Sequence, residues 1–182
     1  MRADYVDGDV LELLLTALMP ANRLALQVSL CTGLRIGDVL ALRTERLQQR
    51  MTVEERKTGK HRRIYLPVGL YEALLRQAGE IFVFPSRLSE RRHRTRQAVY
   101  KDLRRVSELY RLDGKKIAEH LSPHSARKVY AVSLFRSRAD AKKVQQLLQH
   151  SSEAVTMLYA MADALTAAKL KAEGKAPAAL KK

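Results

Sequence analysis

The sequence is poor in the residues that mark several classes of protein. It has no tryptophan, three phenylalanines and one cysteine, Cys31, among 182 residues. One cysteine cannot close an internal disulfide or form a cysteine-based zinc site, so we expect it to be a small buried hydrophobe in an intracellular protein. The longest apolar run, 13–21, is interrupted by Thr16 and is too short to cross a bilayer. It follows acidic residues, whereas a signal peptide begins with basic ones.

Acidic residues are also few in proportion to basic ones. Lysine and arginine number 34 against 19 aspartates and glutamates, which gives a net charge of +15. That much positive charge on one small domain favours a polyanionic partner, most often nucleic acid. A ribosomal protein or an anionic-membrane binder would carry the same charge. Hydrophobic residues make up 46% of the chain, which argues against general disorder.

Hydrophobic periodicity predicts a mainly α-helical fold with one small antiparallel β-sheet, an α+β class. Strands at 52–54 and 63–66 flank a turn at 57–60 and form the predicted hairpin. The helices are expected at 9–19, from 20 to a stop at Gly33, and at 36–42, 68–78, 95–112, 123–138, 140–148 and from 152.

The polar stretches of the chain predict segments outside the helical core. Residues 81–85 are expected to be a strand or an extended plug, and the arginine-rich stretch 86–96 a solvated loop that becomes ordered on a phosphate backbone. Residues 1–173 are expected to form one catalytic domain and 174–182 a flexible basic tail. Within that domain, the segment 160–171 has enough apolar surface to dock on this or a neighbouring copy, and a frayed end is the alternative.

Motifs for nucleotide- or metal-dependent chemistry are missing. The sequence has no Walker loop, no GxGxxG and no HExxH, and its acidic residues do not cluster as a two-metal nuclease requires. Helix capping explains the close pair Asp7 and Asp9. Ser122 and Ser125 flank His124, but no acid is placed to complete a hydrolase triad.

What remains is a set of basic side chains and one tyrosine, each with an ordinary structural interpretation on its own. A turn lysine such as Lys57 is usually solvated, and a tyrosine late in an amphipathic helix, such as Tyr159, is usually packed at the edge of a core. Together, however, arginines can neutralise a pentacoordinate phosphorane, and a lysine or histidine can protonate a departing 5′ oxygen. A phenol becomes nucleophilic in such a positive field. The set therefore suits phosphodiester transfer to tyrosine without a metal.

Four segments form an ordered series of motifs that ends in this tyrosine. Residues 31–42 read CTGLRIGDVLAL, residues 57–60 read KTGK, and residues 121–127 read LSPHSAR. Residues 147–152 read LLQHSS, and Tyr159 follows their histidine by nine residues. In this order they resemble the first arginine box, the hairpin lysine, the HxxR box, and the last histidine and nucleophile of the tyrosine recombinase (phage integrase) family. The resemblance implies the fold of that family's catalytic domain.

The resemblance assigns a role to each residue at the scissile phosphate. Arg35 and Arg127 would clamp the phosphate, and Asp38 matches the acidic position that supports the first arginine. His124 would assist proton transfer and hold a phosphate oxygen, and His150 would add a hydrogen bond.

The resemblance also assigns the proton donor and the nucleophile. Lys57 would protonate the 5′ oxygen, and Tyr159 would form a 3′-phosphotyrosyl link that allows rejoining without ATP, metal or cofactor. The six other tyrosines lack this spacing. Further basic residues are candidates for contact with the DNA backbone: Lys60, Arg87, Arg91, Arg92, Arg94, Arg96, Lys101 and Lys128.

Three features depart from the family pattern. Gln149 stands where glycine is usual and Lys128 where histidine often follows the second arginine, but neither position is catalytic. Family members usually carry a separate helical core-binding domain, whereas this chain starts almost at the catalytic one. We therefore expect a fragment or a naturally short member that binds DNA weakly by itself.

The resemblance implies a site-specific recombinase or integrase that cleaves and rejoins double-stranded DNA. The resemblance implies a homotetramer on DNA, with a monomer in solution as one option, and accessory DNA-bending proteins, without a membrane partner. We expect the protein to be encoded by a bacterium, a phage or a mobile element. Its expected location is the cytoplasm, in association with the nucleoid. Two alternatives remain, namely a non-catalytic DNA-binding regulator on the same scaffold and an enzyme resembling type IB topoisomerases.

Overall fold

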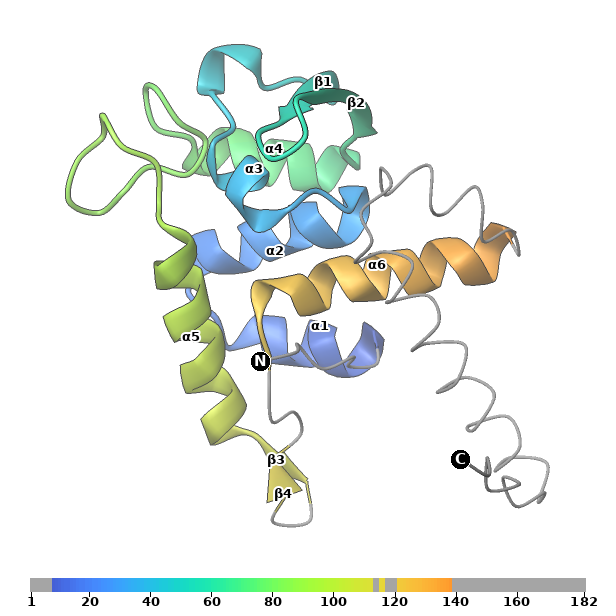
Figure 1. Cartoon of the computed structure of the whole chain (residues 1–182). Coiled ribbons are helices and arrows are strands. Elements are labelled where there is room, and N and C mark those ends of the chain that lie inside the picture. Colours follow the sequence, from blue (N-terminus) through green and yellow to red (C-terminus); the bar gives the residue numbers. More distant parts are fainter. Residues whose placement is uncertain (1–7, 113–114, 117–120, 139–182) are drawn as a thin grey trace. The chain divides into compact units, whose positions relative to one another are not determined.

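A computed structural model describes residues 8–112, 115–116 and 121–138 (Figure 1). The chain divides into two compact units, Met1–Tyr130 and Ala131–Lys182, and the site lies in the first. The helices are α1 (Gly8–Thr16), α2 (Pro20–Thr32), α3 (Ile36–Leu40), α4 (Val68–Gln77), α5 (Arg96–Leu109) and α6 (Pro123–Arg138), with a 3₁₀ turn at Thr44–Arg46. The strands are β1 (Arg50–Glu55), β2 (Lys60–Tyr65), β3 (Arg111–Leu112) and β4 (Lys115–Lys116). The predicted fold class, mainly helical with a small antiparallel sheet, is confirmed.

Helix α2 is central to the first unit, where it contacts α1, α3, α4, α5 and β2. It begins at Pro20, whose fixed φ suits a first helical turn, and ends at Gly33, which has φ +67°. Both ends are as predicted. A Cβ at Gly33 would lie 2.4 Å from the ring of Tyr130, so this corner requires glycine for its conformation and for its close contact with α6.

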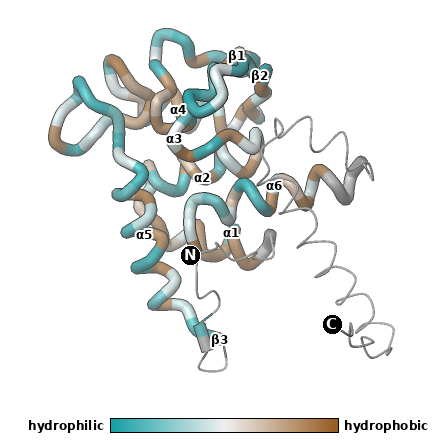
Figure 2. The backbone as a smooth tube through the Cα atoms, in the orientation of Figure 1, coloured by the Kyte–Doolittle hydropathy of each residue, from teal (hydrophilic) through white to brown (hydrophobic). Residues whose placement is uncertain are grey.

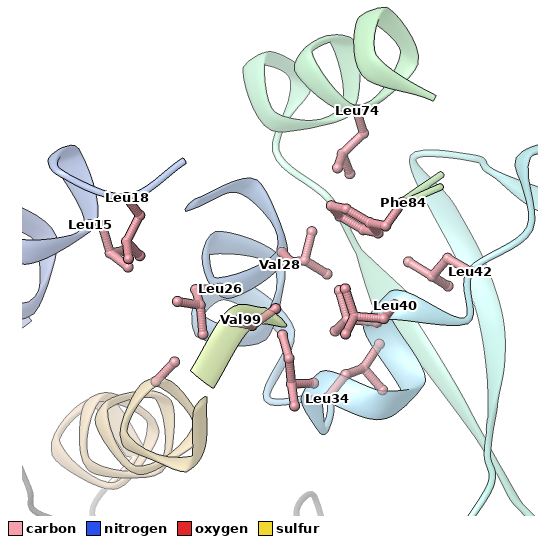
Figure 3. Close-up of a cluster of buried hydrophobic side chains, with 14 of the residues drawn as sticks. Leu15, Leu18, Leu26, Val28, Leu34, Leu40, Leu42, Leu74, Phe84 and Val99 are labelled. Carbon is pink, nitrogen blue, oxygen red and sulfur yellow. The ribbon is translucent and has the colours of Figure 1, made fainter. Parts of the chain in front are cut away.

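The hydrophobic core gathers around α2, as Figure 3 shows. Val28 of α2, Leu40 of α3 and Leu74 of α4 are completely buried, and Phe84 packs among them. Leucine, valine, isoleucine and alanine supply nearly all of the buried apolar residues, as the scarcity of aromatics predicts. Within the described ranges, no helix is long and apolar enough to cross a membrane.

Strands β1 and β2 form the predicted hairpin, with Arg50 opposite Tyr65 and Glu55 opposite Lys60. The turn between them includes Gly59 at φ +64°. Because side chains alternate along a strand, Glu55 points inward with Val53 and is buried. The hairpin thus carries a charged residue into the interior next to its turn.

Residues 81–95 are connected by backbone bridges and hydrogen bonds. The segment 81–85 is an extended plug, held by isolated bridges between Arg43 and Phe82 and between Pro85 and His93. The Arg94 N–H donates to the Phe84 carbonyl at 2.7 Å, and the ring of His93 meets that of Phe82 edge to face. Backbone bonds thus tie the loop to the segment 81–85, and the exposure of Arg87, Arg91 and Arg92 agrees with the predicted solvated loop. Ordering of the loop on a phosphate backbone stays a prediction.

Helix α5 begins as predicted and ends earlier. The Thr95 hydroxyl accepts a hydrogen bond from the Ala98 N–H at 3.1 Å and caps the helix. The helix was expected to reach residue 112, but Arg111 and Leu112 pair with Lys115 and Lys116 instead. Figure 2 shows hydrophilic and hydrophobic residues alternating along α5, as an amphipathic helix requires.

The prediction that Cys31 is buried is wrong, because its side chain is exposed. It lies on the face of α2 that carries Leu24 and Gln27, at three- to four-residue spacing, and lines a hollow shared with α1 and the start of α4. The opposite face of α2, with Ala25, Val28 and Thr32, packs into the core.

Candidate active site

The corner between α2 and α3 places Arg35 beside the hairpin. Arg35 is the residue before the first turn of α3, and its Nη1 donates to Oε2 of Glu55 in a charge-assisted ion pair. The Arg35 side chain is only 12% exposed. One edge of this guanidinium is thus fixed by a carboxylate from β1.

Arg127 reaches the same corner from α6. It is 5% exposed, and its Nη1 donates to the Gly33 carbonyl at 2.8 Å. The left-handed conformation of Gly33 leaves this carbonyl without a place in the helical ladder and available to an arginine. The two arginines predicted to clamp a phosphate therefore converge on the Gly33–Arg35 corner, although they are far apart in the sequence.

Asp38 joins α3 to the hairpin turn. It is 4% exposed, and its Oδ1 accepts a hydrogen bond from the Arg56 N–H at 3.1 Å. Burial raises the pKa of Asp38, and the neighbouring Glu55 charge raises it further, whereas the Arg56 N–H and the charges of Arg35 and Arg127 lower it. The expected supporting position is thus next to both arginines.

Three residues of the cluster were not singled out from the sequence as part of a site, namely Glu55, Arg62 and Tyr130. Glu55 is fully buried, and its Oε1 lies 3.6 Å from Nη1 of Arg62. Arg62 also donates to the Gly33 carbonyl at 3.4 Å and lies over the ring of Tyr130, 5.7 Å from its centre. The available signal was the two-residue alternation of the hairpin, which puts a charged residue of each strand on the side of Val53 and Ile64.

The charged side chains of this cluster have one more positive charge than negative charges. Arg35 and Arg62 are paired with Glu55, and the charges of Arg35 and Arg127 act on Asp38, so these five side chains carry a formal charge of +1 when both acids are ionised. A phosphodiester with one negative charge would balance it. In the part of the chain that the structure describes, no group of three or more metal-binding side chains occurs.

The remaining predicted catalytic residues are exposed or lie outside the described residues. Lys57 is exposed in the hairpin turn. His124 is exposed at the start of α6, where its N–H donates to the Ser122 hydroxyl at 3.2 Å. His150 and Tyr159 lie outside the described residues, so their places in the site stay predictions.

The candidates for DNA contact divide into two groups. Arg94 is half-buried, and its Nη1 donates to Oδ1 of Asn22 at 3.3 Å. Burial lowers the pKa of Arg94, and the charge of Arg87 lowers it further. Arg94 therefore holds the loop to α2, and Lys128 is half-buried on α6. The exposed candidates are Lys60, Arg87, Arg91, Arg92, Arg96 and Lys101.

Solved structures share this fold. The XerH site-specific recombinase bound to difH substrate superposes with a TM-score of 0.63 at 21% identity, covering 84% of this chain and 49% of that one. A lambda integrase dimer bound to a COC′ core site gives a TM-score of 0.63 at 21% identity, covering 86% and 48%. The fold is that of the tyrosine recombinase catalytic domain.

Sequence comparison places the chain in a family. Tyrosine recombinase XerD of Vibrio vulnificus strain YJ016 is 28% identical over 151 residues, which are 76% of this chain and 48% of that protein. The chain spans about half the length of the curated XerD relatives it matches. The model of the phage integrase family matches residues 4–165, and the chain belongs to this family.

Proposed function

We propose that this chain carries the catalytic centre of a site-specific DNA recombinase that transfers a DNA strand to Tyr159 and back. The observation that supports this most is the convergence of Arg35 and Arg127 on the Gly33–Arg35 corner. In the same unit, the turn that holds Lys57 is bound to Asp38. Membership of the phage integrase family supports the same chemistry.

The arginines hold the scissile phosphate. Attack at phosphorus places additional negative charge on the non-bridging oxygens, and guanidiniums that are already oriented stabilise this charge without reorganising. The orientation of Arg35 comes from Glu55, and that of Arg127 from the Gly33 carbonyl. The net charge of the cluster matches the single charge of a phosphodiester.

The transfer itself exchanges one phosphoester for another. The Tyr159 oxygen forms a bond to phosphorus while the bond from phosphorus to the 5′ oxygen breaks. The phenol proton passes to His124, and Lys57 gives a proton to the departing 5′ oxygen. Because the number of phosphoester bonds is unchanged, a 5′ hydroxyl from another strand can reverse the step without ATP. No step uses a metal.

The proposed substrate is double-stranded DNA, and we propose a homotetramer assembled on it, assisted by DNA-bending proteins. The XerH structure is a complex with its difH substrate, and the lambda integrase structure is a dimer on a core site. The exposed arginines of the loop 86–95, with a net chain charge of +15, suit a phosphate backbone.

The proposal is tested with a pool of duplexes that are randomised around a nick and incubated with the chain in EDTA without ATP. Cleavage a few nucleotides from the nick releases a short 5′-hydroxyl fragment, so the covalent complex cannot reverse and accumulates. We expect a denaturation-resistant protein–DNA adduct in wild type and in Tyr100→Phe, an exposed control. Tyr159→Phe should bind the selected DNA equally well and form no adduct.

Three other outcomes would contradict the proposal. Tight binding to a selected sequence with no adduct would indicate a DNA-binding regulator on this scaffold. Relaxation of supercoiled plasmid without joining of two sites would indicate a topoisomerase. An adduct that persists in Tyr159→Phe would place the nucleophile elsewhere.

A further inference from the structure

We propose that Glu55 is a positioning residue that orients Arg35 and couples it to the hairpin turn that carries Lys57. This inference rests on the proposed function and deepens it. Glu55 itself would not touch the DNA, because it is fully buried and negatively charged like the phosphate. Its effect would pass through the groups that it holds.

The Glu55 side chain is held between two arginines. Its Oε2 is paired with Nη1 of Arg35, and its Oε1 lies 3.6 Å from Nη1 of Arg62. A buried carboxylate between two guanidiniums has little freedom to move, because separating any of these charges without water is costly. Glu55 uses one amino group of Arg35 and leaves the other donors of that planar fork for a phosphate oxygen.

The Glu55 main chain forms the base of the lysine turn. Its carbonyl accepts hydrogen bonds from the Thr58 N–H at 3.0 Å and from the Gly59 N–H at 2.8 Å. Lys57 lies inside the turn that these two bonds close. One residue thus joins the first arginine, through its side chain, to the turn of the predicted general acid, through its backbone.

A second carboxylate strengthens the same connection. Oδ1 of Asp38, on α3, accepts the Arg56 N–H at 3.1 Å, so the residue after Glu55 is tied to the helix that follows Arg35. Both ties cross between the α2–α3 corner and the hairpin. A change in the charge of Glu55 should therefore misplace Arg35 relative to the turn, whose backbone bonds remain, without removing either catalytic group.

The test compares Glu55→Gln with Glu54→Gln in the full chain. Glutamine keeps the shape of the side chain but removes its charge, and Glu54 is the exposed neighbour on the opposite face of β1. With the duplex selected by wild type, we expect Glu55→Gln to form the Tyr159 adduct about 10- to 100-fold more slowly at saturating protein, since small misplacements of a catalytic group have effects of this size. The Kd for DNA should change less than about twofold, and Glu54→Gln should match wild type.

A readout without DNA follows the ion pair directly. In nitrogen NMR of the arginine side chains, the Arg35 guanidinium should show slow rotation in wild type and in Glu54→Gln, and fast rotation in Glu55→Gln. A melting temperature for each variant separates this effect from unfolding. If Glu55→Gln forms the adduct as fast as wild type, or loses rate, affinity and melting temperature together, the positioning role is wrong. If wild type forms no adduct, the proposed function fails, and unchanged Arg35 rotation in Glu55→Gln would separately refute the orientation of Arg35.

Discussion

Two arginine-rich regions of this chain differ in what surrounds their guanidinium groups. In the cluster at Gly33, Arg62 and Arg127 are 7% and 5% exposed and are held by carboxylate or carbonyl oxygens. In the loop 86–95, Arg91 and Arg92 are exposed to solvent. Arginine side chains are thus buried and paired in the cluster and exposed to solvent in the loop.

The difference shows how one kind of side chain can serve two purposes. A buried guanidinium must be paired, and the pairing fixes its direction, which suits the stabilisation of a transition state at one point. An exposed guanidinium adapts to whatever anion approaches and is screened by salt, which suits attraction of a polyanion. We therefore expect the cluster to control the rate of the reaction and the loop to control affinity.

The largest expected effect comes from removing a buried arginine. Arg127→Ala should slow adduct formation by about 10²- to 10³-fold, because it removes a preorganised charge from the transition state, while the Kd for DNA changes little. Arg91→Ala should do the reverse, leaving the rate for bound DNA unchanged and reducing the slope of log K against log salt by ~0.9 if Arg91 binds one phosphate. Single-turnover rates and binding isotherms over a range of salt concentrations check both. Equal losses of rate and affinity in the two variants would remove the distinction.

An intermediate effect, on stability, is expected at Gly33, whose carbonyl accepts hydrogen bonds from Arg62 and Arg127. Gly33→Ala should lower the free energy of unfolding by about 1–3 kcal/mol, because a Cβ strains the left-handed backbone and overlaps Tyr130. Gly69→Ala is the control, since a Cβ at that helical position has nothing within 4 Å and alanine favours the helix. Urea unfolding of the three proteins measures the difference. A Gly33→Ala variant as stable as wild type would contradict the described packing.

The smallest effect is a pH dependence with opposite signs at two buried carboxylates. Burial raises the pKa of Asp38, so its ionisation should cost stability as the pH rises through that pKa. At Asp102 burial also favours a higher pKa, but hydrogen bonds from Asn22, Arg105 and the Met19 N–H outweigh it and lower the pKa. The stability from Asp102 should therefore be present above its usual pKa of 3.8 and be lost as the pH falls through the lowered value.

The two asparagine variants separate these signs. At pH 7, Asp102→Asn should be less stable than wild type by about 0.5–1.5 kcal/mol, since neutral hydrogen bonds replace charge-assisted ones, and this deficit should shrink near pH 3. Asp38→Asn should gain on wild type as the pH rises from 3 to 7. Urea unfolding across this range measures both, and parallel curves for wild type and Asp38→Asn would show that Asp38 has an ordinary pKa.

The sequence predicted the features that local chemistry decides. Pro20 and Gly33 gave the ends of α2, and the turn residues at 57–60 gave the hairpin, because φ preferences act within a few residues. The burial of Glu55 and Arg62 follows from strand alternation only once the buried face of the hairpin is known. The ion pair with Arg35 depends on tertiary packing, which no local pattern contains.

Tertiary packing also explains where residue type alone misleads. Cys31 was expected inside because of its residue type, but the orientation of α2 places it beside the hollow under α1. In the loop 86–95, Arg94 was grouped with the solvated arginines because of its residue type, but it turns inward to Asn22. The motifs singled out Arg35, Lys57, His124 and Arg127 as candidates, and the structure shows what holds the two arginines.

The most direct test of the whole account is to identify the amino acid that carries the DNA in the trapped complex. Two tyrosines are candidates for this residue. Tyr159 has the family spacing, and the hydroxyl of Tyr130 lies in the arginine cluster, 3.4 Å from Nη2 of Arg62. Protease digestion of the adduct and mass spectrometry of the nucleotide-bearing peptide distinguish them. We predict that the nucleotide is on Tyr159 alone and that Arg35→Ala or Arg127→Ala abolishes most of it. A nucleotide on Tyr130 or any other residue, or an adduct that forms equally well without these arginines, would contradict the account.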